Sequence, residues 1–159
     1  MSENPVNNNV LLVKRLSETA KLPVKAHATD AGYDIFCDHP FVLDSLGYDD
    51  PYAHVSLFAV KVRTGISLGI PSGHYVRIAE KSGLASKGVK VNGGVIDEGY
   101  TGEIIVLLSN ISDNLLRFER GDKIAQLILE KISSFPVMEV DSLTDSERAA
   151  NGFGSTGSK

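Results

Sequence analysis

Short apolar runs alternate with turn-forming residues along the chain from position 10 onward. This rhythm predicts many short strands and little helix. The expected strands cover Val10 to Leu16, a segment ending near Ile35, Val60 to Ile70, Tyr75 to Ala79, Val95 to Ile96, Glu103 to Leu108, Asn114 to Phe118, Ile124 to Leu129 and Val137 to Val140. One helix of a turn or two is expected from Ser82, before Gly88 stops it. The pattern therefore predicts an all-β domain, either a sandwich or a barrel.

The stretch from Val91 to Leu108 combines turn chemistry with two apolar runs. We expect the runs on either side of the Asp-Glu-Gly turn that begins at Asp97 to pair as a β-hairpin, with Gly99 at positive φ. An Asp at the mouth of a hairpin can orient a water, and Tyr100 can lay its ring against a flat ligand. From the turn alone, a purely structural role is the stronger interpretation.

The composition limits the kinds of partner. The 159 residues fit one domain, and a formal net charge of −4 gives no basic field for nucleic acid. The single cysteine, Cys37, excludes an internal disulfide and is expected in the core. No apolar segment is long enough to span a membrane, and the amino terminus lacks a secretory pattern. We therefore expect a cytoplasmic protein, or a nuclear one in a eukaryotic host, with neither nucleic acid nor membrane as partner.

Four further features offer chemistry, each beside an ordinary structural alternative. Lys81 and Ser82 open the short helix and could bind a phosphate, although an N-cap is the commoner role. Gln126 lies in an apolar run and needs partners, either in a core network or in a ligand. Asp34 alone is typical of a turn acid or a backbone cap. The backbone of the Gly-rich tail could surround a polyphosphate, and the guanidinium group of Arg148 could donate two hydrogen bonds to its oxygens. The alternative is that the tail is simply a flexible end.

Five separated motifs together resemble the trimeric dUTP pyrophosphatase (dUTPase) family. They are AGYDI at 31–35, PSGHYVRIAEKSGLA at 71–85, GGVIDEGYTGEI at 93–104, GDKIAQLI at 121–128 and RAANGFGSTG at 148–157. They occur in the order of the five family motifs and span nearly the whole chain from about position 10. Five ordered motifs are far more specific than any one of them.

The resemblance implies a jelly-roll-like β-barrel with a flexible C-terminal arm and very little helix. It divides the chain into a disordered amino terminus at 1–9, a barrel domain at 10–140 and the arm at 141–159. The family forms homotrimers whose shared active sites are closed by the arm. It hydrolyses dUTP to dUMP and pyrophosphate with Mg²⁺, which keeps uracil out of DNA and supplies dUMP for thymidylate synthesis.

The family's functional residues match positions of this chain. Asp97 matches the catalytic carboxylate that orients water for attack on the α-phosphorus, and Asp34 matches the acid that holds a water of the Mg²⁺ shell. The matching substrate-binding residues are Lys81, Ser82, Gly83 and Gln126 for the phosphates, Gly94, Val95 and Ile96 for the uracil edge, Tyr100 for the deoxyribose, Phe153 for stacking on uracil, and Arg148, Gly154, Ser155 and Thr156 for the γ-phosphate. Phosphoanhydride cleavage needs such positioning and charge neutralisation.

The chain departs from the usual family pattern at several positions, among them Val76 and Glu80 in the second motif. Lys81 and Lys123 stand where Arg is usual, so that two planar guanidinium groups become point charges. Ala149 and Asn151 replace glycines at the root of the arm. The spacer before the second motif is also longer than in compact members, with the extra length near residues 45–54.

Two alternatives share this fold. A dCTP deaminase carries a similar hairpin but needs a catalytic Glu on the returning strand, where Ile104 to Leu108 has no acid. A regulatory dUTP-binding module would not need to keep all the matching functional residues, which are Asp34, Asp97, Tyr100 and Phe153. Hydrolysis of dUTP is therefore the preferred interpretation.

Overall fold

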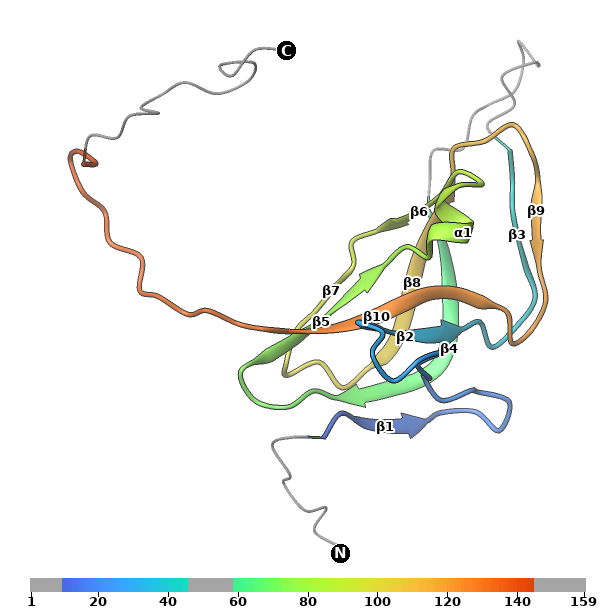
Figure 1. Ribbon diagram of the computed structural model, residues 1–159, viewed down its shortest axis with the longest axis horizontal. Helices are drawn as coiled ribbons and strands as arrows, with labels where there is room; N and C mark the ends of the chain where they lie inside the picture. Colours follow the sequence, from blue (N-terminus) through green and yellow to red (C-terminus); the bar gives the residue numbers. More distant parts are fainter. Residues whose placement is uncertain (1–9, 46–58, 145–159) are drawn as a thin grey trace, which may run out of the picture.

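Ten strands and one short helix are formed by residues 10–45 and 59–144, the residues that the computed structural model describes (Figure 1). The strands are β1 (Leu12–Arg15), β2 (Gly32–Phe36), β3 (Phe41–Leu43), β4 (Val60–Gly69), β5 (His74–Ala79), β6 (Val89–Asn92), β7 (Val95–Ile96), β8 (Glu103–Asn110), β9 (Leu116–Phe118) and β10 (Lys123–Lys131). The helix is α1 (Ser82–Ala85). The prediction of an all-β, jelly-roll-like fold is confirmed.

The strands form two four-stranded sheets and one two-stranded sheet among the described residues. The first sheet has the order β1-β4-β8-β6 and the second has the order β2-β10-β5-β7, while β3 pairs with β9. All these pairs are antiparallel. The sheets share one core, but within residues 10–45 and 59–144 their strands do not pair into a single closed barrel.

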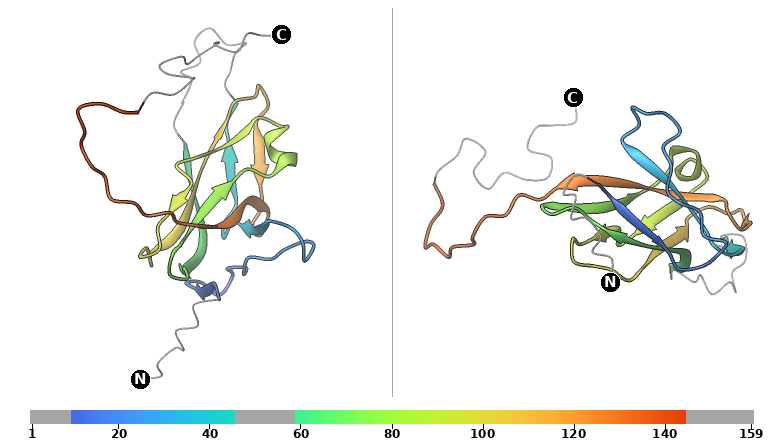
Figure 2. Two further views of the ribbon diagram at one scale, coloured as in Figure 1. Left: turned by 60° about the vertical axis from the view of Figure 1, so that its left-hand side comes forward. Right: turned by 90° about the horizontal axis from the view of Figure 1, so that it is seen from below.

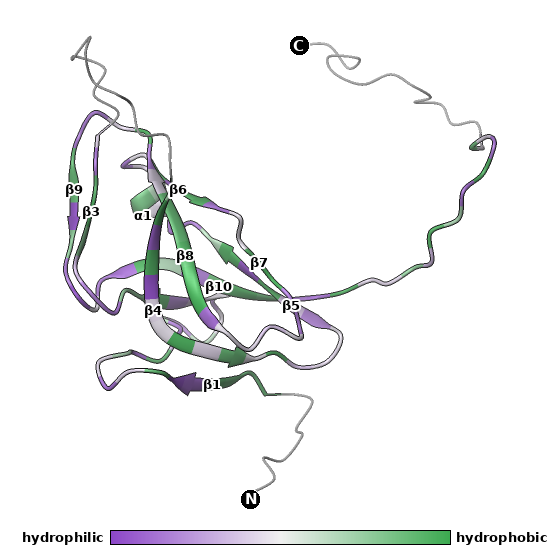
Figure 3. Cartoon of the chain, turned by 180° about the vertical axis from the view of Figure 1, so that it is seen from behind, coloured by the Kyte–Doolittle hydropathy of each residue, from purple (hydrophilic) through white to green (hydrophobic). Residues whose placement is uncertain are grey.

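The hydrophobic core contains side chains from both large sheets. Ile104, Val106 and Leu108 of β8 are buried at every second position, because side chains of a strand alternate between its two faces. They belong to the same buried cluster as Leu127 of β10. Figure 3 shows the apolar stretch of β8 in the middle of the domain. Cys37 is buried in this core, as predicted.

The predicted hairpin is wrong in its pairing. β7 pairs with β5 in the second sheet, whereas β8 pairs with β4 and β6 in the first, so residues 97–102 form a corner between two sheets. The reason lies at Gly94, where a Cβ atom would stand 2.4 Å from the carbonyl oxygen of Ile78. Without a side chain, this part of the chain lies close against β5. Positive φ is found at Gly93 (59°), just before β7, and not at Gly99.

The predicted strand from Val137 to Val140 is also wrong. After β10 the chain runs away from the domain in an extended form, as both Figure 1 and Figure 2 show. Val137, Met138 and Val140 are exposed, and no strand of the described residues pairs with them. An extended segment is a strand of a sheet only where a neighbour accepts its backbone hydrogen bonds.

The short helix predicted before Gly88 is confirmed as α1. It makes a single turn, and Gly88 follows with a φ of 85°, which ends the helical path. Within the described ranges, no helix combines the length and the hydropathy needed to cross a membrane.

Candidate active site

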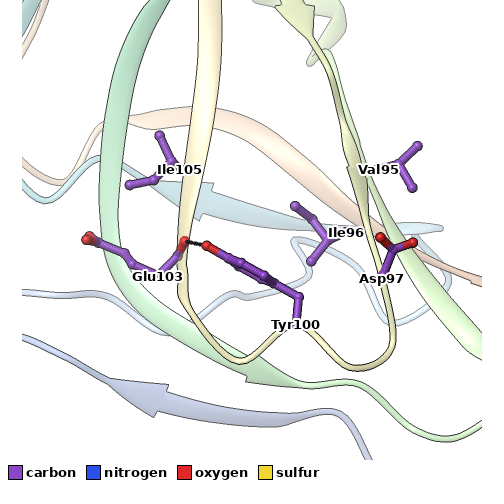
Figure 4. Close-up of a pocket in the computed structure, with 6 residues that line it drawn as sticks. All are labelled: Val95, Ile96, Asp97, Tyr100, Glu103 and Ile105. Carbon is purple, nitrogen blue, oxygen red and sulfur yellow. Dashed lines mark hydrogen bonds between the residues drawn. The ribbon is translucent and has the colours of Figure 1, made fainter.

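A cavity of about 160 Å³ opens at the corner between β7 and β8 (Figure 4). Its lining residues are Val95, Ile96, Asp97, Tyr100, Glu103 and Ile105, and we call it the corner pocket. The two strands diverge into different sheets, so their side chains leave a space between them. The structure therefore brings together four residues that the sequence analysis assigned to the base, the sugar and the attacking water.

Tyr100 lies across the corner pocket and is fixed by its hydroxyl group. The hydroxyl donates to the main-chain oxygen of Glu103 at 2.9 Å, and 45% of the residue remains exposed. Figure 4 shows the ring directed from the turn toward β8. Gly102 leaves room for it, because a Cβ atom there would lie 2.6 Å from the Tyr100 oxygen and displace the ring. The ring thus presents an accessible, oriented surface to a ligand.

Glu103 anchors the β8 side of the pocket. Its carboxylate accepts hydrogen bonds from Arg63 Nε at 2.9 Å and from the Gly65 amide at 2.9 Å. Gly65 has a φ of 67° and lies where the register of β4 against β8 shifts. The sequence analysis did not assign Glu103 to the site, because its partners on β4 are close only in the fold.

The outer edge of β7 offers backbone groups. β7 is the last strand of the second sheet, so one of its sides has no strand neighbour among the described residues. The carbonyl of Gly94 already accepts the Ile78 amide at 2.7 Å. Alternate residues of an antiparallel ladder direct their backbone groups to opposite sides. The amide and carbonyl of Val95 therefore point away from β5, where the edge of a planar ligand could meet them.

Asp97 follows β7 directly and is exposed. Its main-chain oxygen accepts the Tyr100 amide at 3.0 Å, which closes the turn. In Figure 4 its carboxylate lies on the β7 side of the pocket, beside Val95. Its carboxylate enters no salt bridge with any other described residue. An acid with free oxygens at the mouth of a pocket is suited to accept a proton from water.

A second region of the site lies on the second sheet, where one carboxylate meets two lysines. We call Asp34, Lys81 and Lys123 the charge cluster. Lys81 Nζ donates to Oδ1 of Asp34, and Lys123 Nζ lies 2.7 Å from Oδ2. The Asp34 side chain is 8% exposed, against 28% for Lys81 and 48% for Lys123. The cluster therefore buries its negative group and directs one excess positive charge toward the surface.

The two lysines keep Asp34 ionised. Burial raises the pKa of this carboxyl group, but the hydrogen bonds and charges of Lys123 and Lys81 outweigh burial, so that the pKa of Asp34 lies below its usual value. A carboxylate with a low pKa and two ammonium partners is a poor base. The cluster is therefore suited to stabilising a charged ligand rather than to transferring a proton.

A β-bulge places Lys123 on the same face as Asp34. Gln126 pairs with Asp34, and Lys123 pairs with Phe36, the residue two positions after Asp34. In a regular strand, Lys123 and Gln126 would point to opposite faces because three positions separate them. A register shift just after Lys123 adds one residue to β10 and turns Lys123 toward Asp34.

Gln126 lies beside the charge cluster in an inner strand of the sheet. Its Nε2 donates to the main-chain oxygen of Glu80 at 2.8 Å. Its Oε1 lies over Gly32, where a Cβ atom would stand only 2.3 Å away. One partner of Gln126 is therefore internal, as the core interpretation required. The side-chain amide is oriented before any ligand binds.

The first turn of α1 adjoins the charge cluster because Lys81 is its N-cap residue. The main-chain oxygen of Lys81 accepts the amides of Leu84 and Ala85, each at 2.9 Å. The amides of Ser82 and Gly83 have no acceptor within a helix, as is general for a first turn. Both residues are exposed, and a Cβ atom at Gly83 would meet nothing within 4 Å. A phosphate group therefore has open access to this turn.

On one chain, the corner pocket and the charge cluster lie far apart. Ile96 pairs with Val76, and Lys81 follows Val76 by five residues. Lys81 lies beyond the end of β5 but binds Asp34, which lies level with Gln126 and Ala79, three strands away from β7. At about 3.3 Å per residue of strand and about 4.8 Å between neighbouring strands, roughly 10 Å along the strands and roughly 14 Å across the sheet separate Ile96 from Asp34. Asp97 and Lys81 of the same chain therefore cannot both contact one phosphate group.

The other predicted site residues lie outside the described residues. They are Arg148, Phe153, Gly154, Ser155 and Thr156, and most of the longer spacer near residues 45–54 lies outside them as well. The sequence analysis treated Lys123 only as a departure from a pattern and did not assign it to the site. No strand periodicity could have found it, because a regular strand would direct it away from Asp34.

Comparisons with known proteins identify the family of the chain. A family model described as dUTPase matches residues 18–157. A deoxyuridine 5'-triphosphate nucleotidohydrolase of Candida glabrata is 43% identical over 154 residues, which cover 96% of this chain and 99% of that protein. The protein of the same name from Mus musculus is 41% identical, with 90% of this chain and 82% of that protein covered.

Solved structures of phage dUTPases share the fold. The dUTPase of Staphylococcus bacteriophage 80alpha, solved with dUPNHPP, aligns with a TM-score of 0.81 at 29% identity and covers 94% of this chain and 99% of that chain. A dUTPase of phage phi11 of S. aureus, whose structure is said to reveal a structural Mg(II) ion, aligns with a TM-score of 0.71 at 27% identity over 84% of this chain and 98% of its own.

The order of the second sheet explains why the motifs are so widely spaced along the chain. β2, β10, β5 and β7 lie side by side, and they belong to the motifs AGYDI, GDKIAQLI, PSGHYVRIAEKSGLA and GGVIDEGYTGEI, respectively. Four motifs that are distant in sequence thus meet on neighbouring strands. With the family match over most of its length, the chain belongs to the dUTPase family and is a dUTP diphosphatase.

Proposed function

We propose that this dUTP diphosphatase works as a homotrimer in which the corner pocket of one subunit and the charge cluster of another bind the same dUTP molecule. The observation that carries this proposal is the distance on a single chain between Ile96 and Asp34, the partner of Lys81, which is roughly 10 Å along the strands and roughly 14 Å across the sheet. In a closed ring of identical subunits, each chain would supply its corner pocket to one site and its charge cluster to the next. The reaction converts dUTP to dUMP and pyrophosphate, as in the family.

The corner pocket binds the nucleoside. The outward backbone groups of Val95 pair with the uracil edge, flanked by Gly94 and Ile96. A cytosine would present the wrong donor and acceptor pattern and leave buried groups unpaired, which is the strongest form of discrimination that a small pocket has. Tyr100 packs against the deoxyribose, and its ring leaves no room for a 2′-hydroxyl group.

Asp97 acts as the general base. Its free carboxylate accepts a proton from a water molecule as the water oxygen bonds to the α-phosphorus. The bond from this phosphorus to the oxygen that bridges to the β-phosphorus breaks, and pyrophosphate leaves with that oxygen. The proton on Asp97 then passes to solvent, to which the residue is exposed.

The charge cluster and the first turn of α1 bind the phosphates. Lys81 supplies a positive charge, while Ser82 and Gly83 offer a hydroxyl group and backbone amides. Gln126, already oriented by Glu80, lies between this turn and Asp34 and contacts the phosphate chain or its water. The arm residues Arg148, Phe153, Gly154, Ser155 and Thr156 would complete the site over the γ-phosphate and the uracil.

The donor set fits a Mg²⁺ ion that arrives with the triphosphate. Among the described residues, no three His, Cys, Asp or Glu side chains are grouped as a metal cage. Mg²⁺ commonly binds through phosphates and waters with only one or two carboxylates. Asp34 would hold one water of its shell, since each carboxylate oxygen keeps a second lone pair beside its ammonium partner. When bound, the ion would neutralise charge on the phosphates.

A subunit complementation experiment tests the shared site. Asp97→Asn leaves the charge cluster intact, and a Lys81→Met, Ser82→Ala double variant leaves the corner pocket intact. Each variant alone should release little pyrophosphate from dUTP with Mg²⁺. After mixed refolding at equal amounts, random trimers should recover about a quarter of the wild-type turnover, because about one site in four then receives both intact halves.

Two outcomes would contradict the proposal, one in the mixing experiment and one in an assay of the wild-type protein. Recovery no greater than the sum of the separate variants would show that each site belongs to one chain. Release of pyrophosphate from dCTP rather than dUTP by the wild-type protein would contradict the substrate. Mixing each variant with itself under the same refolding conditions is the control.

A further inference from the structure

Two lysines share one buried carboxylate in the charge cluster, although one ammonium group is enough to neutralise it. Lys81 and Lys123 bind different oxygens of Asp34, so neither blocks the other. Lys81 is also the N-cap residue of α1, where the phosphates of dUTP are proposed to bind. Lys123 is on β10 and reaches Asp34 only because of the β-bulge.

This arrangement sets the free energy needed to release Lys81 for substrate. If Lys81 were the only partner of Asp34, its departure toward a phosphate would leave a buried carboxylate without a counter-charge. Breaking a buried pair in this way is strongly unfavourable. With Lys123 in place, Asp34 keeps one hydrogen-bonded ammonium group when Lys81 leaves.

We propose that Lys123 is a positioning residue that holds Asp34 on the protein side and thereby releases Lys81 to bind the phosphate chain of dUTP. The inference rests on the proposed phosphate site at Lys81 and adds a role for Lys123, to which the proposed function assigns no contact with base or phosphate. The bulge in β10 is the structural device, because it is what turns Lys123 toward Asp34.

The exposure of the three side chains fits this division of roles. Asp34 is nearly closed off from solvent, so its charge needs a permanent partner. Lys81 is partly exposed at the open first turn of α1 and has space to move toward a ligand. Gln126 is bound to Glu80 and cannot replace a departing ammonium group at Asp34, since an amide is neutral.

A double-mutant cycle tests the inference. The affinity for dUpNHpp is measured by titration calorimetry for wild type, Lys123→Met, Lys81→Met and the double variant, with the trimer verified by size-exclusion chromatography. Lys123→Met should bind about tenfold more weakly, and Lys123→Arg should restore most of the affinity. In the Lys81→Met background, Lys123→Met should cause no further loss, because no lysine remains to be released.

The control is Lys90→Met, which removes an exposed ammonium group 3.9 Å from Glu80 and should leave the affinity unchanged. An equal loss on Lys123→Met with and without Lys81 would overturn the inference and assign Lys123 a general structural or electrostatic role. No loss in either background would overturn it too. If Lys123→Met does not assemble, Lys123→Gln takes its place in the same cycle.

Failure of the proposed function has a different signature. In that case wild-type protein neither hydrolyses dUTP nor binds dUpNHpp, or Lys81→Met binds as tightly as wild type. If wild type and Lys81→Met behave as expected and only the cycle fails, the inference about Lys123 alone is wrong.

Discussion

The corner pocket and the charge cluster each contain one acid of the proposed site, and they hold it in opposite ways. Asp97 is exposed at the end of β7 and enters no salt bridge with any described residue. Asp34 is buried, and each of its oxygens is bound by an ammonium group. A base needs a free oxygen and access to water, whereas a charge that organises phosphate ligands needs fixed partners. The two side chains are chemically identical. Their different surroundings therefore suit Asp97 to the role of base and Asp34 to the role of a fixed charge.

The difference also separates catalysis from stability. Few interactions hold Asp97, so its loss removes chemistry and little else. Two charge-assisted hydrogen bonds connect Asp34 to β10 and to the start of α1, so its loss affects the fold as well as the ligand. Substitutions at the two positions should thus differ in which property they change.

The largest effect is expected for Asp97→Asn. Removal of the proposed base should lower the rate of pyrophosphate release from dUTP by at least about 100-fold. The melting temperature should be almost unchanged, because substitutions at exposed positions alter stability by about 0.5 kcal/mol or less. Asp113→Asn, in another exposed turn, is the matched control and should retain full turnover. Turnover within a fewfold of wild type would exclude Asp97 as the base.

A smaller effect, on the pocket wall rather than on the chemistry, is expected for Gly94→Ala. The new methyl group would meet the Ile78 carbonyl at 2.4 Å and push β7 away from β5. We expect the free energy of unfolding to fall by about 2 kcal/mol and uracil recognition to weaken with it. Both are measured by urea unfolding and by the KM for dUTP.

Gly99→Ala is a close control, since a Cβ atom there has open space and Gly99 does not have positive φ. Equal unfolding midpoints for the two variants would show that the close approach at Gly94 does not position β7.

The smallest effect is expected for Asp34→Asn, and it depends on pH. The variant should be about 1 to 2 kcal/mol less stable than wild type at pH 7, an estimate reduced because both lysines are partly exposed. The pKa of Asp34 is lowered by folding, so its pairing stabilises the protein fully above the unfolded value of about 3.9. This contribution is lost as the pH falls through the folded pKa.

The difference in urea midpoint between wild type and Asp34→Asn should therefore shrink as the pH is lowered below about 4. A difference that stays constant from pH 7 to the acid limit of folding would show that the charge of Asp34 does not stabilise the cluster. Asp113→Asn again serves as control in the same series.

The amino-acid sequence by itself determined the class of fold and indicated most residues of the proposed site. Apolar periodicity and turn residues located β1, β5 and α1, because strand alternation and helix stops are local properties. The five ordered motifs indicated the family, and with it Asp97 and Tyr100. These conclusions depend on residue types and their order, which the sequence contains in full.

Only the tertiary structure decided which segments meet. β7 and β8 were predicted to pair with each other, but Gly94 allows β7 to join β5, and the corner pocket is the result. Lys123 reaches Asp34 through a bulge that no periodic pattern contains. Strand pairing and register depend on contacts between residues far apart along the chain, so local patterns cannot specify them. The same contacts decide that one aspartate is free to act as a base and the other is not.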